Sequence, residues 1–255
     1  MTDTPTPAPG FRAALSNRTI LMTIGALALT TAAASVALLL QGSGSVQNRA
    51  AIEQVVREYI LEHPEILPEA MDRLKAKQTG ALIDAHRTAI ETPFAGAWEG
   101  AEKGDVVLVE FFDYACGYCR AALPEIAKLV SENKDLKVVY RELPILSDES
   151  VDAAKVSQLA AEKRVYQAYH RELYAAGQVT RATILASAEK AGLDRKAAEA
   201  AMTDKRYDKE IASNLELAQD LQVRATPTFV IGNQVLEGAL GYDALKKAIA
   251  DARAK

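Results

Sequence analysis

Apolar positions first form a long unbroken run near the N-terminus. Residues 19–40 contain no charged side chain, and 22 such residues are enough to cross a bilayer as a helix. Arg12 and Arg18 precede the run, so the positive-inside rule places the rest of the chain outside the cytoplasm. A secretory signal cleaved at the small residues 32–34 is the alternative, but the apolar run continues beyond them to Leu40. We therefore favour an uncleaved anchor, and both alternatives export the remaining chain.

Two short helices with one apolar face each are predicted next. Residues 41–45, Gln-Gly-Ser-Gly-Ser, have the composition of a flexible linker. Apolar positions then recur at helical spacing over residues 46–78, with a break at His63-Pro64. Such short helices need a partner for their apolar faces, which is either the rest of the same chain or another copy of it in an oligomer. A further short helix is expected within residues 81–104. The apolar positions of the two segments are Ile52, Val55, Val56, Tyr59, Ile60, Leu67, Ala70, Met71 and Leu74.

A buried strand and an amphipathic helix meet at the only two cysteines of the chain. Residues 106–112 are a continuous β-branched and aromatic run, which predicts a buried strand. Residues 120–130 carry apolar side chains at helical intervals. Cys116 and Cys119 therefore lie where the strand turns into the helix. Their only possible intramolecular disulfide is with each other.

This position favours disulfide exchange over cross-linking. At a helix N-terminus, unpaired N–H groups and the helix dipole stabilise the thiolate of Cys116, while Cys119 lies nearly one turn further into the helix. An exposed attacking sulfur and a shielded resolving sulfur form a dithiol that can exchange disulfides. A bridge that closes so short a loop would remove little entropy from the unfolded chain.

The rest of the chain predicts further strands and a long helical interval. Helical spacing extends from about residue 148 to residue 221, much longer than a simple crossover. Within it, Gly192 is expected to end one helix and Asp194 to cap the next. The last two strands are separated by a two-residue turn, which predicts an antiparallel pair. The expected strands are residues 136–143, 228–231 and 234–237, and the expected terminal helix is residues 242–254.

The run Glu-Phe-Phe-Asp-Tyr-x-Cys-Gly-Tyr-Cys at residues 110–119 resembles the thioredoxin superfamily, and within it the DsbA-like and DsbC-like thiol-disulfide oxidoreductases of the bacterial envelope. A second stretch, Ala-Thr-Pro-Thr-Phe-Val at residues 225–230, resembles the cis-proline loop of that family. The resemblance covers roughly residues 103–255. It implies an α/β thioredoxin-like fold with an inserted helical domain at about residues 148–221. The helical extension at residues 46–102 is similar to that of ScsC-like members, and some relatives with such extensions oligomerise.

The same resemblance implies roles for residues around the dithiol. A cis bond between Thr226 and Pro227, in a loop facing Cys116, would let that loop present backbone polar groups to a bound client. Gly117 and Tyr118 would contact the client and influence the reduction potential, because residues between the cysteines alter thiolate stability. The Gly-Tyr pair and Thr226 resemble the isomerase and reductase members more than the strongest oxidases.

Glu110 stands on an otherwise apolar strand, where an unpaired carboxylate is unfavourable to bury. Relatives keep a carboxylate beneath the dithiol, and the resemblance implies that Glu110 has a raised pKa and shuttles protons. The alternative is a glutamate exposed at the edge of the sheet.

Composition excludes several other classes of function. The net charge of −4 gives no electrostatic reason to expect nucleic acid, and two cysteines cannot form a four-thiolate zinc site. His63, His86 and His170 lack metal-ligand spacing and are expected at the surface or in caps. No cofactor is expected besides the redox-active Cys116–Cys119 disulfide. The competing class is a protein that binds Cu(I) through the two cysteines, although the four methionines form no cluster beside them.

We therefore predict an envelope enzyme that exchanges disulfides with exported proteins, and we favour an isomerase or reductase over a DsbA-like oxidase. These activities use the same atoms, so the sequence does not give the direction of exchange. The expected partners are cysteine-containing clients, a membrane redox protein that the sequence does not identify, other copies of the chain and the inner membrane. The expected order is a cytoplasmic tail (1–18), a membrane span (19–40), a linker (41–45), the helical extension (46–102) and the catalytic domain (103–255).

Overall fold

The computed structural model describes residues 48–254. The chain divides into two units, residues 1–70 and residues 71–255. The membrane span expected at residues 19–40 and the linker that follows it lie outside the described residues. Within residues 48–254, no helix is both long enough and apolar enough to cross a membrane.

The helical extension is less interrupted than expected. One helix covers residues 48–62, and after the break at His63-Pro64 helix α2 runs without a gap over Ile66–Glu91. The expectation of a separate short helix after residue 81 is therefore wrong. Gly80, where the apolar pattern lapses, is buried within α2, and a Cβ atom there would lie 3.3 Å from the Asn233 side chain. Close packing here offsets the low helix propensity of glycine.

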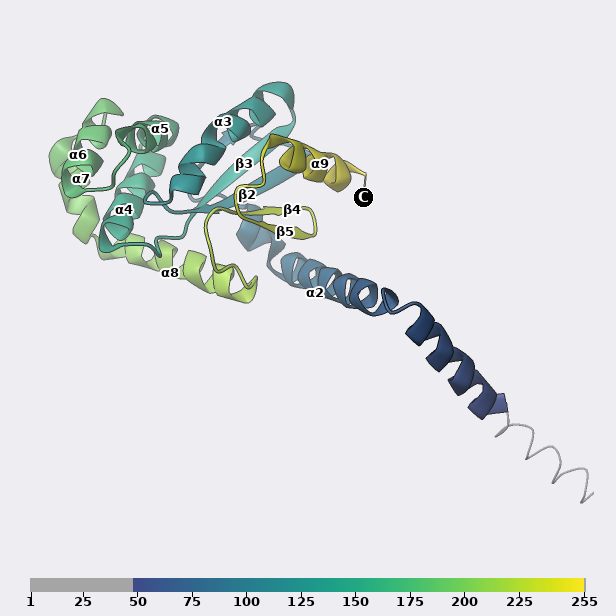
Figure 1. The fold of residues 1–255 in the computed structure, drawn as a ribbon. Coiled ribbons are helices and arrows are strands. Elements are labelled where there is room, and N and C mark those ends of the chain that lie inside the picture. Colours follow the sequence, from purple (N-terminus) through teal and green to yellow (C-terminus); the bar gives the residue numbers. More distant parts are fainter. Residues whose placement is uncertain (1–47, 255) are drawn as a thin grey trace, which may run out of the picture. The chain divides into compact units, whose positions relative to one another are not determined.

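A five-stranded mixed sheet forms the centre of the second unit, in the order β1-β3-β2-β4-β5 (Figure 1). The pair β2–β3 is parallel, whereas β1, β4 and β5 each run antiparallel to a neighbour. The strand β1 was not expected from the sequence, because three residues are too few to show an alternation. The strands are β1 (Trp98–Gly100), β2 (Val106–Phe112), β3 (Leu136–Glu142), β4 (Thr228–Ile231) and β5 (Gln234–Glu237), and the helices packed on them are α3 (Gly117–Glu132), α8 (Lys205–Asp220) and α9 (Tyr242–Arg253), besides α2.

Alternation along β2 divides its side chains between two hydrophobic cores. Leu108 and Phe112 join the core beneath α3 and α9, whereas Val109 and Phe111 join the core that α2 and α8 complete. Figure 1 shows these two pairs of helices on opposite faces of the sheet. Glu110 has the same phase as Leu108 and Phe112, so its side chain points toward the face covered by α3.

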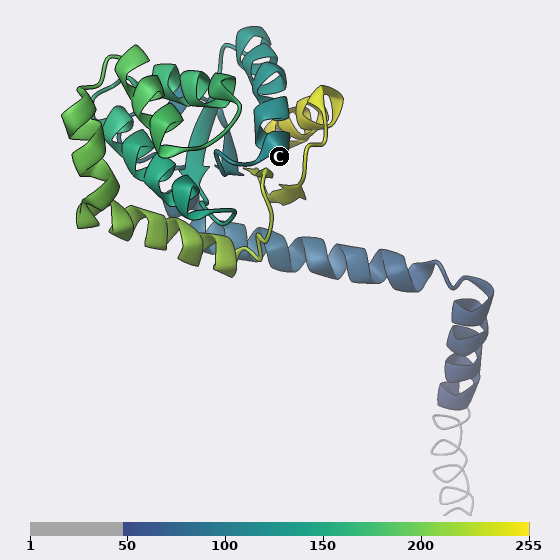
Figure 2. The ribbon, with the colours of Figure 1, turned by 60° about the vertical axis from the view of Figure 1, so that its left-hand side comes forward.

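The interval expected to be helical does contain five consecutive helices, which gather beside the sheet (Figure 2). Four of them begin with a side chain that accepts a hydrogen bond from the first turn, as expected for Asp194. Gly192 follows the end of α6 with φ +93°, the conformation that favours glycine there. Besides α8 the helices are α4 (Asp148–Glu162), α5 (Tyr166–Ala176), α6 (Arg181–Lys190) and α7 (Arg195–Thr203).

A buried arginine ties β3 to the end of α2. The Arg141 guanidinium donates to the carbonyl oxygens of Ala89, Ile90 and Thr92, where α2 has no backbone partners left for them. It also donates to the Glu210 carboxylate on α8 at 3.1 Å. One side chain thus satisfies a helix terminus and an acidic group in the interior.

Replacing this arginine should destabilise the fold strongly. We expect Arg141→Met to lower the free energy of unfolding by about 2–3 kcal/mol, because the carbonyl oxygen of the buried Ile90 and the partly buried Glu210 carboxylate lose their partner. Urea denaturation measures the loss. Arg195→Met is the control, since Arg195 forms a half-exposed ion pair with Glu189, and it should change the free energy by less than about 1 kcal/mol. Equal effects of the two variants would contradict this account of Arg141.

Candidate active site

The two cysteines lie at the start of α3, as the strand-to-helix transition predicts. Cys116 is the N-cap residue, and its sulfur accepts a hydrogen bond from the backbone N–H of Cys119 at 3.4 Å. Both cysteines are free thiols in this structure. Cys116 is 6% exposed and Cys119 is 1% exposed, so the attacking sulfur is better shielded than we expected. Cys119 is nevertheless the more deeply buried of the two.

The proline loop faces the dithiol from the other end of the chain. The Thr226–Pro227 peptide bond is cis, which confirms the prediction. The Cys116 thiol donates to the Thr226 carbonyl oxygen at 3.2 Å, although 110 residues separate them. The Pro227 carbonyl oxygen accepts from the Gly238 N–H at 2.8 Å, which holds the loop against the end of β5.

Glu110 is fully buried beneath the dithiol and not exposed at a sheet edge. Its side chain is 1% exposed, and its Oε1 atom has no hydrogen-bond partner among the described residues. Burial raises the pKa of Glu110 well above its usual value, and the nearby Cys116 sulfur raises it further. Burial likewise raises the pKa of the Cys119 thiol, and the Glu110 carboxylate adds to that shift. The Glu110 carboxylate therefore favours the protonated form of the Cys119 thiol.

Asp113 fixes the loop between β2 and α3, a role that we did not predict. One carboxylate oxygen accepts from the Ala115 N–H at 2.7 Å, and the other accepts from the N–H groups of Ile145 and Leu146 at 2.9 Å each. The Asp113 carbonyl oxygen accepts from the Tyr174 hydroxyl at 3.0 Å. The catalytic loop is thus joined to the loop after β3 and to α5.

His170 is buried, so the expectation of a surface or cap position is wrong. A directed chain of hydrogen bonds starts at its Nδ1 atom: the Tyr114 hydroxyl donates to Ser157, and Ser157 donates to the Glu142 carboxylate. The Tyr114 oxygen then accepts from Nδ1–H. Burial, with a smaller contribution from Arg171, lowers the pKa of His170 to about 3, so the imidazole is neutral near pH 7. The helical spacing of aromatic side chains in α5 was the available signal for this cluster. The rings of Phe112, Tyr140, Tyr166 and Tyr174 also contact His170.

Exposed apolar side chains lie next to the dithiol. Tyr118, between the two cysteines, is 71% exposed, and Gly117 leaves the surface beside it open. Ile145 and Leu146 are 44% and 53% exposed, and their backbone is held to the catalytic loop by Asp113. An unfolded polypeptide could therefore meet an apolar surface and a reactive sulfur at the same place.

No metal cluster accompanies the cysteines. Across residues 48–254, the structure contains no group of three or more His, Cys, Asp or Glu side chains that could hold a metal ion.

The burial of Glu110 predicts a specific pH dependence of stability. Because its folded pKa is raised above the usual 4.5, the folded state holds its proton more tightly than the unfolded state, and stability is lost as pH rises above that value. We expect Glu110→Gln to remove this loss, which amounts to about 1.4 kcal/mol per pH unit between the two pKa values. Urea denaturation at pH 4 and pH 8 measures it. Glu237→Gln, at an exposed position on β5, should keep the wild-type pH dependence. An identical pH dependence in Glu110→Gln would argue against a perturbed Glu110.

Comparison with known proteins agrees with this geometry. The model of the DSBA-like thioredoxin domain family matches residues 107–250, and that of the copper resistance protein ScsC N-terminal domain matches residues 48–80. A thioredoxin-like oxidoreductase from Silicibacter pomeroyi is 34% identical, with a TM-score of 0.63 over 66% of this chain and 98% of that one. Proteus mirabilis ScsC in a transitional conformation is 27% identical, with a TM-score of 0.62 over 81% of this chain and 95% of that one.

Two curated relatives, both named as Na(+)/H(+) antiporters, are much longer than this chain. The Na(+)/H(+) antiporter NhaA 1 of Salinispora arenicola is 28% identical over 156 residues, which are 60% of this chain and 24% of the antiporter. The chain thus spans about a quarter of that relative. The family match covers more than half of the chain and contains both cysteines and the proline loop. The chain therefore belongs to the DSBA-like thioredoxin domain family.

Proposed function

We propose that this protein is a thiol-disulfide oxidoreductase that exchanges disulfides with exported proteins through Cys116 and Cys119. The observation that carries the proposal is the arrangement of three groups. A helix N-terminus holds Cys116, a shielded Cys119 lies behind it, and the backbone of Thr226 faces its sulfur at 3.2 Å. The membership in the DSBA-like family supports the same activity.

The exchange proceeds in two steps that balance in atoms and electrons. The Cys116 thiolate attacks one sulfur of a client disulfide, forming a mixed disulfide and releasing the other client sulfur as a thiolate, which takes up a proton. The Cys119 thiolate then attacks Cys116, which releases the second client thiol. The client gains two electrons and two protons, and the enzyme dithiol becomes a disulfide. The reverse sequence oxidises a client dithiol.

Glu110 is the group that we propose to manage the proton in the second step. The Cys119 thiol has a raised pKa and must lose its proton before it can attack. Glu110 is buried on the face of β2 that α3 covers, and one of its carboxylate oxygens has no hydrogen-bond partner among the described residues. It is electrostatically coupled to the sulfur atoms of both Cys116 and Cys119. A carboxylate with a raised pKa accepts and returns a proton near neutral pH.

Client binding would use the apolar rim of the dithiol and the proline loop. Tyr118, Ile145 and Leu146 offer exposed apolar surface, and the backbone of Thr226, which the cis bond to Pro227 holds beside the Cys116 sulfur, would pair with an extended chain. Backbone hydrogen bonds and general apolar contact would not select one sequence. This supports action on many clients.

We propose an isomerase or reductase direction, with a DsbA-like oxidase as the alternative. The Gly117-Tyr118 pair and Thr226 support the former by resemblance. A reduction potential measured against glutathione separates the two, because about 30 mV changes the equilibrium tenfold for this two-electron couple. A potential as high as that of a strong oxidase would favour the alternative.

The helical extension supports the isomerase direction, because its apolar side chains are exposed in the described chain and could join several copies into an oligomer. Ile52, Val55 and Tyr59 on the helix over residues 48–62 are each more than half exposed, and so is Met71 on α2. Exposed apolar stripes of this kind form helix–helix interfaces. We propose that residues 46–78 join copies of the chain, so that several dithiols can act on one client.

The location that we propose is the bacterial periplasm, with the chain anchored in the inner membrane by residues 19–40. The basic residues before that run support the orientation, and a periplasmic thioredoxin-like protein from Salmonella enterica is among the similar solved structures, at 27% identity and a TM-score of 0.60. A mature N-terminus near Ser35, found by N-terminal sequencing, would show a cleaved signal in place of an anchor.

A copper-binding protein is the second candidate. It is suggested by the name of the family that matches residues 48–80, although that segment does not include the cysteines. Cu(I) titration of the reduced protein with a competing chelator tests it. Tight binding with no disulfide exchange would favour copper carriage.

The roles of the two cysteines can be separated by alkylation. We expect iodoacetamide at pH 7 to modify Cys116 of the reduced protein at least tenfold faster than Cys119, because Cys119 is the more deeply buried of the two and burial raises the pKa of its thiol. Peptide mass spectrometry of timed samples measures both rates, with each single Cys→Ser variant as a control. Faster modification of Cys119 would reverse the assignment.

The extension can be tested by deletion. We expect the intact protein to be an oligomer that reshuffles scrambled ribonuclease, and the chain lacking residues 46–78 to be a monomer that still exchanges a disulfide with a model peptide but isomerises poorly. Light scattering and recovery of ribonuclease activity measure the two properties. An intact protein that is monomeric at micromolar concentration and inactive as an isomerase would favour the oxidase.

A further inference from the structure

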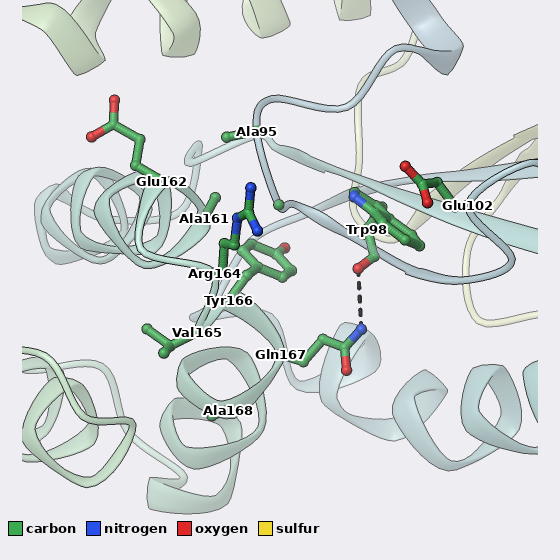
Figure 3. A pocket seen from close by; sticks show the side chains of 11 residues that line it. Ala95, Trp98, Glu102, Ala161, Glu162, Arg164, Val165, Tyr166, Gln167 and Ala168 are labelled. Carbon is green, nitrogen blue, oxygen red and sulfur yellow. Dashed lines mark hydrogen bonds between the residues drawn. The ribbon is translucent and has the colours of Figure 1, made fainter.

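A cavity of about 900 Å³ lies away from the cysteines, between the residues that lead into β1 and the turn that joins α4 to α5. One wall includes Ala95 and Trp98, and the other includes Ala161, Arg164 and Gln167 (Figure 3). The Gln167 amide donates to the Trp98 carbonyl oxygen at 3.2 Å and so joins the two walls. Disulfide exchange makes no use of this cavity.

A free guanidinium and an indole ring face this space. Figure 3 shows the Arg164 side chain reaching into the cavity opposite Trp98. Among the described residues, no side chain forms an ion pair or hydrogen bond with the Arg164 guanidinium. Glu162 is close in sequence, but its carboxylate accepts from the Tyr207 hydroxyl at 2.8 Å and points away from Arg164 in Figure 3. Glu102 also lines the cavity, and in Figure 3 it lies beyond Trp98 from Arg164. The Arg164 guanidinium is therefore the group in this lining that can bind an anion.

The backbone at Arg164 is unfavourable for arginine. The same two backbone hydrogen bonds close the C-terminal ends of helices α4, α6 and α8. This pattern requires that the residue just after the helix adopts the left-handed conformation, with positive φ. At the end of α6 this residue is Gly192, whereas Arg164 follows α4 with φ +61° and Gln222 follows α8 with φ +59°. A glycine at either position would adopt this left-handed conformation without backbone strain and without loss of packing. At Arg164, unlike Gln222, the side chain lines a cavity.

The opposite wall is also held in a restricted conformation. Ala95 has φ +46°, and a Cβ atom on Gly96 would lie 2.8 Å from the Ala161 carbonyl oxygen. Only glycine allows the two walls to approach this closely. Two of the three non-glycine residues with positive φ in the described chain thus line one cavity, as is common at binding sites.

We propose that this cavity binds a small aromatic carboxylate. The planar guanidinium of Arg164 can donate hydrogen bonds to both oxygens of a carboxylate. The indole ring of Trp98 offers a flat surface on which an aromatic ring can stack. The Lys137 ammonium lies 5.4 Å from the centre of the indole ring and adds positive charge on that side. This site is independent of the proposed disulfide exchange.

The only tryptophan of the chain reports on this cavity directly. We would titrate the protein with 4-nitrobenzoate and, in parallel, with the neutral 4-nitrobenzamide, because both nitroaromatic rings quench indole fluorescence. We expect saturable quenching by 4-nitrobenzoate and at least tenfold weaker binding of 4-nitrobenzamide. Equal, non-saturating quenching by the two compounds would overturn the proposal.

Matched variants test the role of Arg164. Arg164→Gly and Arg164→Gln should each weaken 4-nitrobenzoate binding at least tenfold, while Gln222→Gly, the same backbone change at the end of α8, should leave it unchanged. Neither glycine variant should lower the melting temperature, because glycine suits the left-handed conformation. Unchanged binding in Arg164→Gln, or an equal loss in Gln222→Gly, would exclude Arg164 as the anion-binding group.

Discussion

The antiparallel pairing of β4 with β2 is the constraint on which the site depends. Because Phe111 pairs with Thr228, the loop that precedes β4 must lie beside the loop that follows β2. The first loop carries Thr226 and Pro227, and the second leads to Cys116. Backbone hydrogen bonding in the sheet therefore brings the proline loop to the attacking sulfur across 110 residues of sequence. The long helical insertion connects β3 to β4 and contributes no strand to the sheet.

Buried polar side chains then join the insertion to the sheet. Asp113 satisfies three backbone N–H groups and holds the loop after β3 against the catalytic loop, while Arg141 satisfies three carbonyl oxygens at the end of α2. Each side chain is itself buried, so these hydrogen bonds satisfy a polar group that the interior would otherwise leave without partners. Glu110 differs from them, because its Oε1 atom lacks a partner in the described part of the chain, as do side-chain atoms of Gln158, His170 and Asn214. An unsatisfied buried carboxylate directly beneath a dithiol is a destabilising feature that proton transfer would explain.

The sequence by itself determined the strands with strong apolar character, the helix that begins at the cysteines and the identity of the dithiol. Local physics is sufficient for these, because a run such as residues 106–112 has few alternatives to a buried strand, and two cysteines can pair only with each other. The membrane span predicted at residues 19–40 rests on length and composition alone and stays a prediction. The cis bond before Pro227 was predictable only because the motif around it resembles a known loop.

Tertiary structure decided what local patterns could not express. The strand β1 has three residues and exists because β3 offers it an edge, and α2 continues through Gly80 because its packing partners compensate for a weak helix former. His170 is buried because aromatic rings from β2, β3 and α5 surround it. The spacing within α5 indicates the members of the cluster on that helix but not its partners on the two strands. The shielding of Cys116 and the raised pKa of Glu110 also arise from contacts distant in sequence, since burial and charge depend on which side chains the fold brings together.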